Sequence, residues 1–411
     1  MRVLHLFEHA VLLPTDYARR ALALLEGLRG QGVQTVQLAG PATRNAGAGA
    51  VPAGWQFYRT APVRPPGCLT NCMPGCLTGC MPGCLSRGAG GLLLARRLHD
   101  VARLTRPQLI HVHAGSRHAL AAWPAARLAG LPLLVEADRR GGADAALPLL
   151  DRLAWRGADA LVAATPDARA LLRAGGIRAR RIAVLPSAAD LPGACVATRV
   201  PPGLEGAPLL AYAGPLERAD GIDLLLEALA LLRRTRPALR LVVAGAGLRL
   251  DELAQRAAAL GLRGHVVFTG ELAGRRIADL LPRADVTVFP AMPGSRAAGM
   301  APPRQLLNAM ARGCTVVASD IACHAGLLVH GHNGVLFRAG SRTALCGALA
   351  RLLDEPLRLR PLGRAAAETI AARHSWPVTA ARYRKLYETI LHDHRRHPGV
   401  PGCRRRGGAD A

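Results

Sequence analysis

Short apolar runs alternate with amphipathic stretches along almost the whole chain. The run "RVLHLF" at the amino end is typical of a buried strand, and "YARRALALLEGLRGQG" after it carries apolar residues at helical spacing. Similar pairs of strand and helix continue as far as "GVLF", residues 334–337. This alternation predicts an α/β protein in which helices cover both faces of parallel sheets.

The alternation runs twice, which predicts two doubly wound domains with a cleft between them. Residues 191–207, "LPGACVATRVPPGLEGA", carry Pro and Gly without periodicity and are interpreted as a linker. We therefore expect a first domain over residues 1–190 and a second over 208–372, followed by a helix over 373–392 and a basic tail over 393–411. Ligands of such sheets bind at the carboxyl ends of the strands, where the strand order reverses, so we expect the site in loops after strands.

Composition and charge bear on the partners. Half of the residues are hydrophobic but only 3% are aromatic, so the core must consist mainly of Leu, Ala and Val. The formal net charge of +25 raises nucleic acid or an anionic membrane as a partner. Nearly all of this charge is Arg, with Lys385 the only Lys, and it is spread along the chain without an aromatic-basic recognition motif. We expect no specific nucleic-acid binding, and peripheral contact with an anionic membrane stays open.

The amino terminus is interpreted as a strand rather than a signal peptide, because His5, Glu8 and His9 interrupt its apolar stretch. No run approaches the roughly 18 uninterrupted apolar residues that a spanning helix needs. We therefore expect a cytoplasmic protein, with contact to the inner membrane surface left open. In a reducing compartment, ten cysteines do not imply disulfides.

Residues 66–86, "PGCLTNCMPGCLTGCMPGCLS", repeat one octet between a predicted strand and a helix that we expect to begin near Gly90. A helix would align the cysteines on one face, but Pro74 and Pro82 favour turns. The spacing between cysteines would suit a thiolate metal site. However, the repeat copies Leu, Thr and Met as faithfully as Cys, which favours an inert insertion produced by tandem duplication.

Glycines follow two strands of the second half. Gly214 ends the strand "LLAYAG", where backbone N–H groups could face a diphosphate, and Arg218 lies close enough in sequence to neutralise it. A surface Arg in a turn is an equal alternative on position alone. The "GAG" of Gly245–Gly247 permits close backbone approach to a donor but lacks the third Gly of a dinucleotide fingerprint.

Polar side chains also lie at strand ends in the first half. "HVHAG" places His113 at the end of a strand, where it could face the cleft, and strand alternation predicts that His111 points to the opposite face. Glu136 ends the strand "LLVEA", where a buried structural acid is an equal alternative to a functional one.

From Leu209 onward, a series of motifs resembles the retaining glycosyltransferases of family 4, which have the GT-B fold of two facing Rossmann-like domains. The matching segments are "YAGPLERADGIDLLLEAL", "LRLVVAGAG", "VVFTGEL", "ADVTVFPA", "LLNAMARGCTVVASD" and "HGHNGVLFRAG". The amino half, with "LFEHAVLLPTDYARRALALLEGLRGQGVQTVQLAGP" and "FYRT", is similar to glycosyltransferases of exosortase and exopolysaccharide loci.

The resemblance implies transfer of a hexosyl unit from a nucleoside diphosphate sugar to an exopolysaccharide or lipid-linked glycan acceptor. It implies that Arg218 contacts the donor phosphates, that His113 contacts the transferred sugar, and that Gly270–Leu272 lies beside the base. No acidic metal motif is evident, so we expect no metal and no cofactor besides the donor substrate.

Among the departures from the family's pattern, two concern a pair of carboxylates. Its pair of Glu residues falls near Met300 and on Asn308, and an amide at Asn308 can hydrogen bond a ribose hydroxyl without supplying a carboxylate. The alternative to an enzyme is therefore a catalytically weakened homologue that serves as a binding or scaffold subunit in polysaccharide assembly.

Overall fold

The computed structural model describes most of the chain. The described residues are 1–8, 16–40, 55–60, 82–113, 115–137, 149–177, 182–189, 206–272, 274–294 and 302–396. The chain divides into two compact units. Unit 1 comprises Met1–Arg139, Ala146–Leu185 and Ala380–Ala411, and unit 2 comprises Arg140–Ala145 and Pro186–Thr379.

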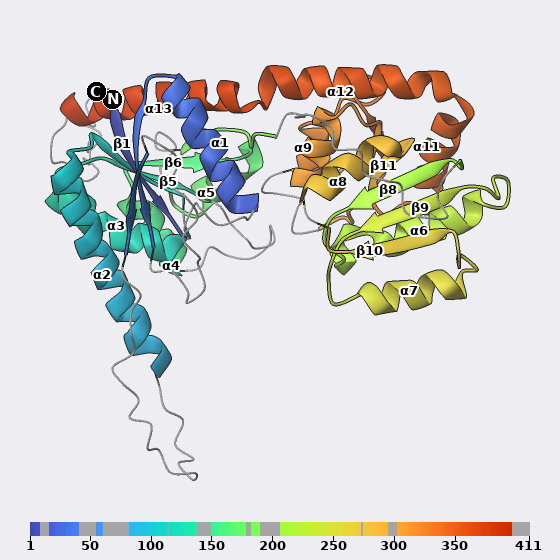
Figure 1. Ribbon diagram of the computed structural model, residues 1–411, viewed down its shortest axis with the longest axis horizontal. Coiled ribbons are helices and arrows are strands. Elements are labelled where there is room, and N and C mark those ends of the chain that lie inside the picture. Colours follow the sequence, from blue (N-terminus) through green and yellow to red (C-terminus); the bar gives the residue numbers. More distant parts are fainter. Residues whose placement is uncertain are drawn as a thin grey trace, which may run out of the picture. The chain divides into compact units, whose positions relative to one another are not determined.

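In unit 1, seven strands of the described residues form a parallel sheet in the order β3-β2-β1-β4-β5-β6-β7 (Figure 1). The strands are β1 (Arg2–Phe7), β2 (Gln34–Ala39), β3 (Gln56–Arg59), β4 (Leu109–Val112), β5 (Leu133–Glu136), β6 (Ala160–Ala163) and β7 (Ile182–Val184). The helices are α1 (Asp16–Gly30), α2 (Pro82–Thr105), α3 (Ser116–Leu128), α4 (Leu149–Gly157), α5 (Pro166–Ala174) and, from Ala380 onward, α13 (Trp376–Arg396).

In unit 2, six strands of the described part form a second parallel sheet in the order β10-β9-β8-β11-β12-β13. They are β8 (Leu209–Ala213), β9 (Arg240–Ala244), β10 (Val266–Gly270), β11 (Val286–Phe289), β12 (Val316–Ser319) and β13 (Val335–Phe337). The helices are α6 (Ile222–Leu232), α7 (Leu250–Ala259), α8 (Gly274–Leu280), α9 (Arg304–Ala311), α10 (Ala322–Ala325), α11 (Arg342–Asp354) and α12 (Leu359–Arg373), with 3-10 turns η2 (Arg218–Asp220), η3 (Leu281–Arg283) and η5 (Pro356–Arg358).

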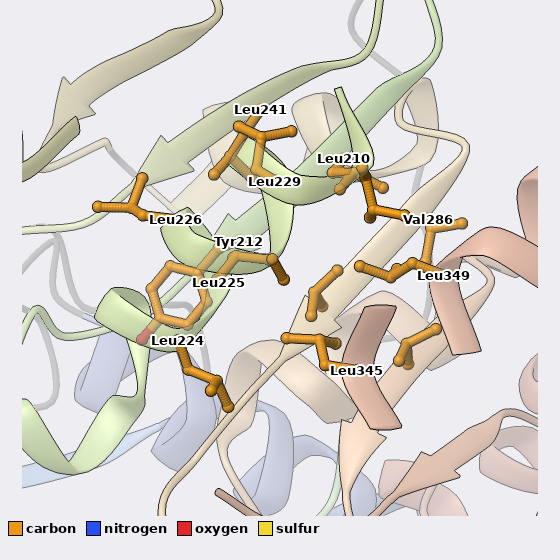
Figure 2. Packing of buried hydrophobic residues seen from close by; sticks show 14 of the residues in the cluster. Leu210, Tyr212, Leu224, Leu225, Leu226, Leu229, Leu241, Val286, Leu345 and Leu349 are labelled. Carbon is orange, nitrogen blue, oxygen red and sulfur yellow. The ribbon is translucent and has the colours of Figure 1, made fainter. Parts of the chain in front are cut away.

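The sheet of unit 2 is buried on both faces because the side chains of each strand alternate between two apolar clusters. Leu210 and Tyr212 of β8 point into a cluster with α6 and α11, where Leu225 and Leu349 meet them (Figure 2). The other residues of β8 point to the opposite face, toward a cluster that includes Met310 of α9. The predicted α/β fold with two parallel sheets is therefore confirmed.

Local sequence signals explain several element ends. Thr165 caps α5 by accepting a hydrogen bond from the Ala168 N–H, and Ser341 caps α11 through the Ala344 N–H. The helix expected to begin near Gly90 begins earlier, at Pro82, because proline is tolerated in the first helical turn. The last helix continues past residue 392 to Arg396.

Several sequence predictions lie wholly or mostly outside the described residues. The Cys repeat is described only from Pro82, the linker only from Gly206, and the basic tail only as far as Arg396. Among the described helices, none combines the length and the hydropathy required to span a bilayer.

Candidate functional site

Each sheet has one place where the strand order reverses. In unit 1 the chain adds β2 and β3 on one side of β1, and then crosses to β4 on the other side. In unit 2 it adds β9 and β10 beside β8, and then crosses to β11. The carboxyl ends at such reversals are where open α/β sheets bind ligands. Most of the predicted site residues lie at or beside these two reversals.

Four predicted glycines line the carboxyl edge of unit 2. The Gly214 N–H donates to the Ala244 carbonyl over 3.0 Å, and the Gly245 N–H donates to the Gly270 carbonyl over 3.0 Å. A Cβ on Gly245 would lie 1.9 Å from the Gly214 oxygen, and one on Gly247 would lie 3.0 Å from Leu216. The structure thus brings Gly214, Gly245, Gly247 and Gly270 together. It also shows why two of them lack a side chain: the backbone segments are too close for one.

The loop after β8 is held against the end of β11. The Tyr212 hydroxyl donates to the Pro215 carbonyl over 2.6 Å, which closes the first part of the loop. Further along, the Met292 N–H donates to the Ala219 carbonyl over 2.9 Å. Gly221 has a φ of +73°, and a Cβ there would lie 2.0 Å from the Pro290 oxygen. Only glycine suits both its backbone and its space, so the loop has a fixed path across the reversal.

Arg218 is the first residue of η2, and its side chain is 84% exposed. Its Nη2 lies 3.9 Å from Glu252, a long ion pair at the surface. A second cation, Arg249, was not predicted from the sequence. Its side chain is 13% exposed and hydrogen bonds to both Asp223 and Glu252. These hydrogen bonds raise the pKa of Arg249, and its charge is already matched by carboxylates. Arg218 is thus the more available of these two cations.

The loop also carries an acidic pair that sequence reasoning missed. Asp220 accepts a hydrogen bond from the Glu217 N–H over 3.0 Å, as part of a capping box around η2. Burial, together with the nearby Glu217 charge, raises the pKa of Asp220 to about 6 against the opposing effect of that hydrogen bond. The signal in the sequence was the E-x-x-D spacing, which has the order of a capping box with Glu217 in place of the usual Ser or Thr and Asp220 in place of Glu or Gln.

The remaining predicted donor contacts are Leu272, just after β10, and Asn308 on α9. Leu272 packs against the core cluster on the α9 side of the sheet. Asn308 is half-buried on α9, between the buried Leu307 and Ala309. Met300 lies outside the described residues. The structure therefore places both Leu272 and Asn308 in unit 2.

In unit 1, His113 follows β4 at the strand reversal and is 5% exposed. Its Nδ1 lies 3.0 Å from Glu136 Oε1, and its Nε2 lies 2.9 Å from His5 Nδ1. The Tyr383 hydroxyl of α13 donates to the same Glu136 oxygen over 2.6 Å. The two predicted strand-end residues, His113 and Glu136, are therefore brought together. Sequence reasoning missed their partners His5 and Tyr383.

The prediction that His111 points away from His113 was wrong. The centroids of the two rings lie 3.8 Å apart, and His111 Nε2 lies 3.5 Å from Glu136. Strand β4 ends at Val112, so the alternation of side chains does not extend to His113. The other ring nitrogen of His111, Nδ1, lies 2.8 Å from the Tyr387 hydroxyl.

The rings of His5, His111 and His113 offer nitrogens within 4.8 Å of one another, a spacing that a metal ion could use. However, both nitrogens of His113 already have hydrogen-bond partners, and the His111 and His113 rings contact each other with their planes tilted by 47°. Burial, and then the charge of His113, lowers the pKa of both His5 and His111 well below 6.5, so both stay neutral. We interpret the group as a hydrogen-bonded network centred on Glu136.

Comparison with known families matches both units. Residues 17–188 match the "Glycosyl transferase 4-like domain", and residues 198–369 match "Glycosyl transferases group 1". The D-inositol 3-phosphate glycosyltransferase of Nocardia farcinica is 34% identical over 248 residues, covering 57% of this chain and 53% of the relative. The phosphatidyl-myo-inositol mannosyltransferase of Mycobacterium leprae is 33% identical over 174 residues, covering 42% and 44%. The chain spans about half the length of the curated relatives it matches.

Solved structures resemble the chain over almost its full length. HepE from Anabaena in complex with UDP is 16% identical, with a TM-score of 0.66 over 95% of this chain and 100% of that one. Sucrose-phosphate synthase from Thermosynechococcus elongatus is 18% identical, with a TM-score of 0.70 over 96% and 100%. The GT-B fold with two Rossmann-like domains is confirmed. By these two matches, residues 198–369 belong to the group 1 glycosyltransferases and residues 17–188 form a glycosyltransferase 4-like domain.

Proposed function

We propose that this chain is a retaining glycosyltransferase that moves a hexosyl unit from a nucleoside diphosphate sugar to an exopolysaccharide or lipid-linked glycan acceptor. The observation that carries the proposal is the glycine-lined edge at the end of β8, β9 and β10. The N–H groups of Gly214 and Gly245 hold this edge together, and the edge leaves a strand reversal clear of side chains, where a diphosphate could approach the backbone of the following loop. The solved complexes of Anabaena HepE with UDP and with UDP-glucose support a donor of this class.

In this proposal the charge of the leaving diphosphate is stabilised by the loop at Gly214 and by Arg218. Charge develops on the leaving group during transfer, so donors aimed at it act mainly in the transition state. Arg218 can serve because its guanidinium is exposed and holds only a long ion pair. The segment Gly270–Leu272 would lie beside the base, and Asn308 would hydrogen bond the ribose.

His113 would orient the transferred sugar from unit 1. Its ring lies at the reversal of the first sheet, where a ligand is expected. One nitrogen is held by Glu136, so a sugar hydroxyl would take the place of His5 at the other. The donor is the substrate, and the proposed reaction uses no cofactor and no metal.

The net charge of the chain and one of its relatives support the proposed location and acceptor. A formal net charge of +25 would favour a peripheral position at an anionic inner-membrane surface, on its cytoplasmic side. The Mycobacterium leprae relative is named as a mannosyltransferase of phosphatidyl-myo-inositol, a lipid acceptor. A lipid-linked glycan is therefore a reasonable acceptor class for this chain.

Calorimetry with UDP, GDP and ADP tests the donor site. Replacing Arg218 by Ala should weaken diphosphate binding by about 1.5 to 3 kcal/mol, because a charge-assisted hydrogen bond is lost. The matched control is Arg263→Ala, which removes an exposed guanidinium just before β10, at the amino end of the strand. Equal affinities of the two variants for the diphosphate would show that Arg218 is a surface residue of a turn with no role in binding. No binding of any diphosphate to the wild-type chain would refute the proposed function.

A second candidate function is a weakened homologue that binds nucleotide as a scaffold subunit. It is favoured by the acidic pair Glu217 and Asp220 beside the proposed phosphate loop, and by an amide at Asn308. Such a protein would bind UDP but neither transfer nor hydrolyse a UDP-sugar. Release of UDP from UDP-glucose, measured over hours with and without a glycan acceptor, separates the two functions.

A further inference from the structure

The network around Glu136 joins strands of unit 1 to its carboxy-terminal helix. Glu136 Oε1 at the end of β5 accepts from the Tyr383 hydroxyl at 2.6 Å and lies 3.0 Å from His113 Nδ1. On the far side of the His113 ring, Nε2 lies 2.9 Å from His5 Nδ1 on β1. Phe7 stacks on the same ring, with centroids 4.6 Å apart and planes within 7°. The His113 ring is therefore fixed on both edges and on one face.

These contacts determine which nitrogen of His113 carries the proton. A carboxylate only accepts hydrogen bonds, so the group that faces Glu136 must be an Nδ1–H. A neutral His113 then has a lone pair on Nε2, and His5 must donate to it from its own Nδ1. The remaining nitrogen of His5, Nε2, is buried without a partner, as expected for an acceptor left over at the end of this chain.

Charges around the carboxylate keep it ionised. Burial alone would raise the pKa of Glu136, but His113, the hydrogen bond from Tyr383 and the charge of Arg20 outweigh burial and lower it. His111 also faces this oxygen at 3.5 Å, while its own Nδ1 is held by Tyr387. The acceptor that fixes the tautomer of His113 is thus ionised at neutral pH.

We propose that Glu136 and Tyr383 are positioning residues: they hold His113 as the Nδ1–H tautomer, so that its Nε2, which accepts from His5 here, can accept from a hydroxyl of the bound sugar in the place of His5. The inference rests on the proposed function, because it assumes that His113 contacts the donor sugar. Tyr383 acts one step further out, since it fixes the Glu136 oxygen that His113 uses. The carboxy-terminal helix α13 thereby contributes to the site in unit 1.

The first test measures turnover of UDP-glucose together with the dissociation constant of UDP. Glu136→Gln keeps the shape but lets an amide nitrogen face the ring, so kcat should fall tenfold or more while UDP affinity stays unchanged. In a His113→Ala background the same substitution should cause no further loss, because residues acting through one another are not additive. A full further loss in that background would overturn the proposal.

The matched control uses the second tyrosine of the same helix. Tyr383→Phe and Tyr387→Phe each remove one buried hydroxyl, but only Tyr383 bonds to Glu136, whereas Tyr387 bonds to His111. Both variants should lower the melting temperature, and only Tyr383→Phe should lower kcat, by severalfold. Equal losses of kcat would mean that the hydroxyls act on stability alone.

A second measurement does not depend on activity. Nitrogen-15 NMR of the His113 side chain, assigned with a His113→Gln variant, reports the protonated nitrogen directly. We expect Nδ1–H in the wild-type chain, and a mixed or Nε2–H form in Glu136→Gln. Nε2–H in the wild-type chain would overturn the proposal. A chain that shows the Nδ1–H form but no turnover would leave the positioning intact and refute the proposed function instead.

Discussion

The strand reversals of the two units have the same topology, but the groups that meet there differ in chemistry. At the reversal of unit 2, the ends of β8 and β9 meet through glycines, with backbone against backbone. At the reversal of unit 1, β1 and β4 meet through imidazole rings that are almost fully buried. Backbone N–H groups suit a fixed anion such as a diphosphate, whereas a titratable ring suits a neutral hydroxyl-bearing group such as a sugar.

This difference shows that a shared topology brings the same strand ends together and leaves their chemistry to a few residues. In unit 2, the backbone segments lie too close for side chains, so adding atoms should be the most damaging change. In unit 1, protonation and hydrogen bonding are the requirement, so changes of pH or of charge should matter most. The predictions below separate the two units on these grounds.

The largest effect is expected for Gly245→Ala in unit 2. A Cβ at this position would lie 1.9 Å from the Gly214 carbonyl oxygen, so the ends of β8 and β9 must separate. We expect a loss of about 3 kcal/mol in the stability of unit 2, together with loss of UDP binding. Chemical denaturation followed by hydrogen exchange of unit 2 peptides measures the change.

Gly347→Ala is the matched control for this substitution. Gly347 lies within α11 of the same unit, and a Cβ there would meet nothing within 4 Å. Ala is favoured over Gly inside a helix by about 0.5 to 1 kcal/mol, so this variant should be slightly more stable and bind UDP normally. If Gly245→Ala behaved like Gly347→Ala, the close approach of β8 and β9 would have no functional meaning.

The second prediction concerns acid stability. His5 and His111 in unit 1 have pKa values held well below 6.5, first by burial, and His324 in unit 2 has a pKa lowered to about 4, also by burial. The unfolded imidazoles bind protons below their ordinary pKa of about 6.5, while the folded ones do not. Each histidine therefore removes up to about 1.4 kcal/mol of stability for every pH unit between about 6.5 and its own lowered pKa, and full stability returns above about 6.5.

Unit 1 holds two fully buried rings of this kind, whereas unit 2 holds His324 and the half-buried His265, whose pKa is also lowered by burial. We expect the two fully buried rings to make unit 1 lose stability more steeply between pH 6.5 and 5. Hydrogen exchange, corrected for the intrinsic pH dependence of the amides, compares peptides of β1 and β4 with those of β12. Substitution of the exposed His332 by Ala should leave both slopes unchanged. Equal slopes in the two units would mean that the rings of unit 1 become protonated without unfolding.

Local elements of both units could be predicted from the sequence, whereas contacts between distant positions could not. The α/β alternation and most strands were predicted because apolar runs and helical spacing are local properties. The glycine positions at strand ends could be found for the same reason. The contacts of His5 and of Tyr383 with the strand-end residues could not, because they join positions far apart in the chain. The two tyrosines at helical spacing in α13 were visible, but nothing in the sequence identified what they would touch.

A third prediction concerns Asp220, beside the proposed phosphate loop. Its pKa of about 6, raised by burial and by Glu217, means that it carries a negative charge at pH 7.5 and is mostly neutral at pH 5. Asp220→Asn keeps an oxygen that can accept from the Glu217 N–H but removes the charge. UDP should therefore bind severalfold more tightly than to the wild type at pH 7.5, and equally tightly at pH 5. Calorimetry at pH 7.5 and at pH 5 tests this prediction. If the ratio of the variant's UDP affinity to that of the wild type were the same at both pH values, Asp220 would not lie near the diphosphate.

The smallest effect is expected at Asn308, the half-buried residue of α9. If position 308 faces the donor ribose, a carboxylate there would accept hydrogen bonds from both hydroxyls more strongly than an amide does. We predict that Asn308→Glu tightens UDP binding severalfold, by about 1 kcal/mol, and raises any donor hydrolysis. Asn308→Gln is the matched control, because it has the same length without the charge and should not tighten binding. Weaker binding by Asn308→Glu in a folded chain would show a pocket adapted to a neutral group. The scaffold interpretation would then lose the support that the missing carboxylate gives it.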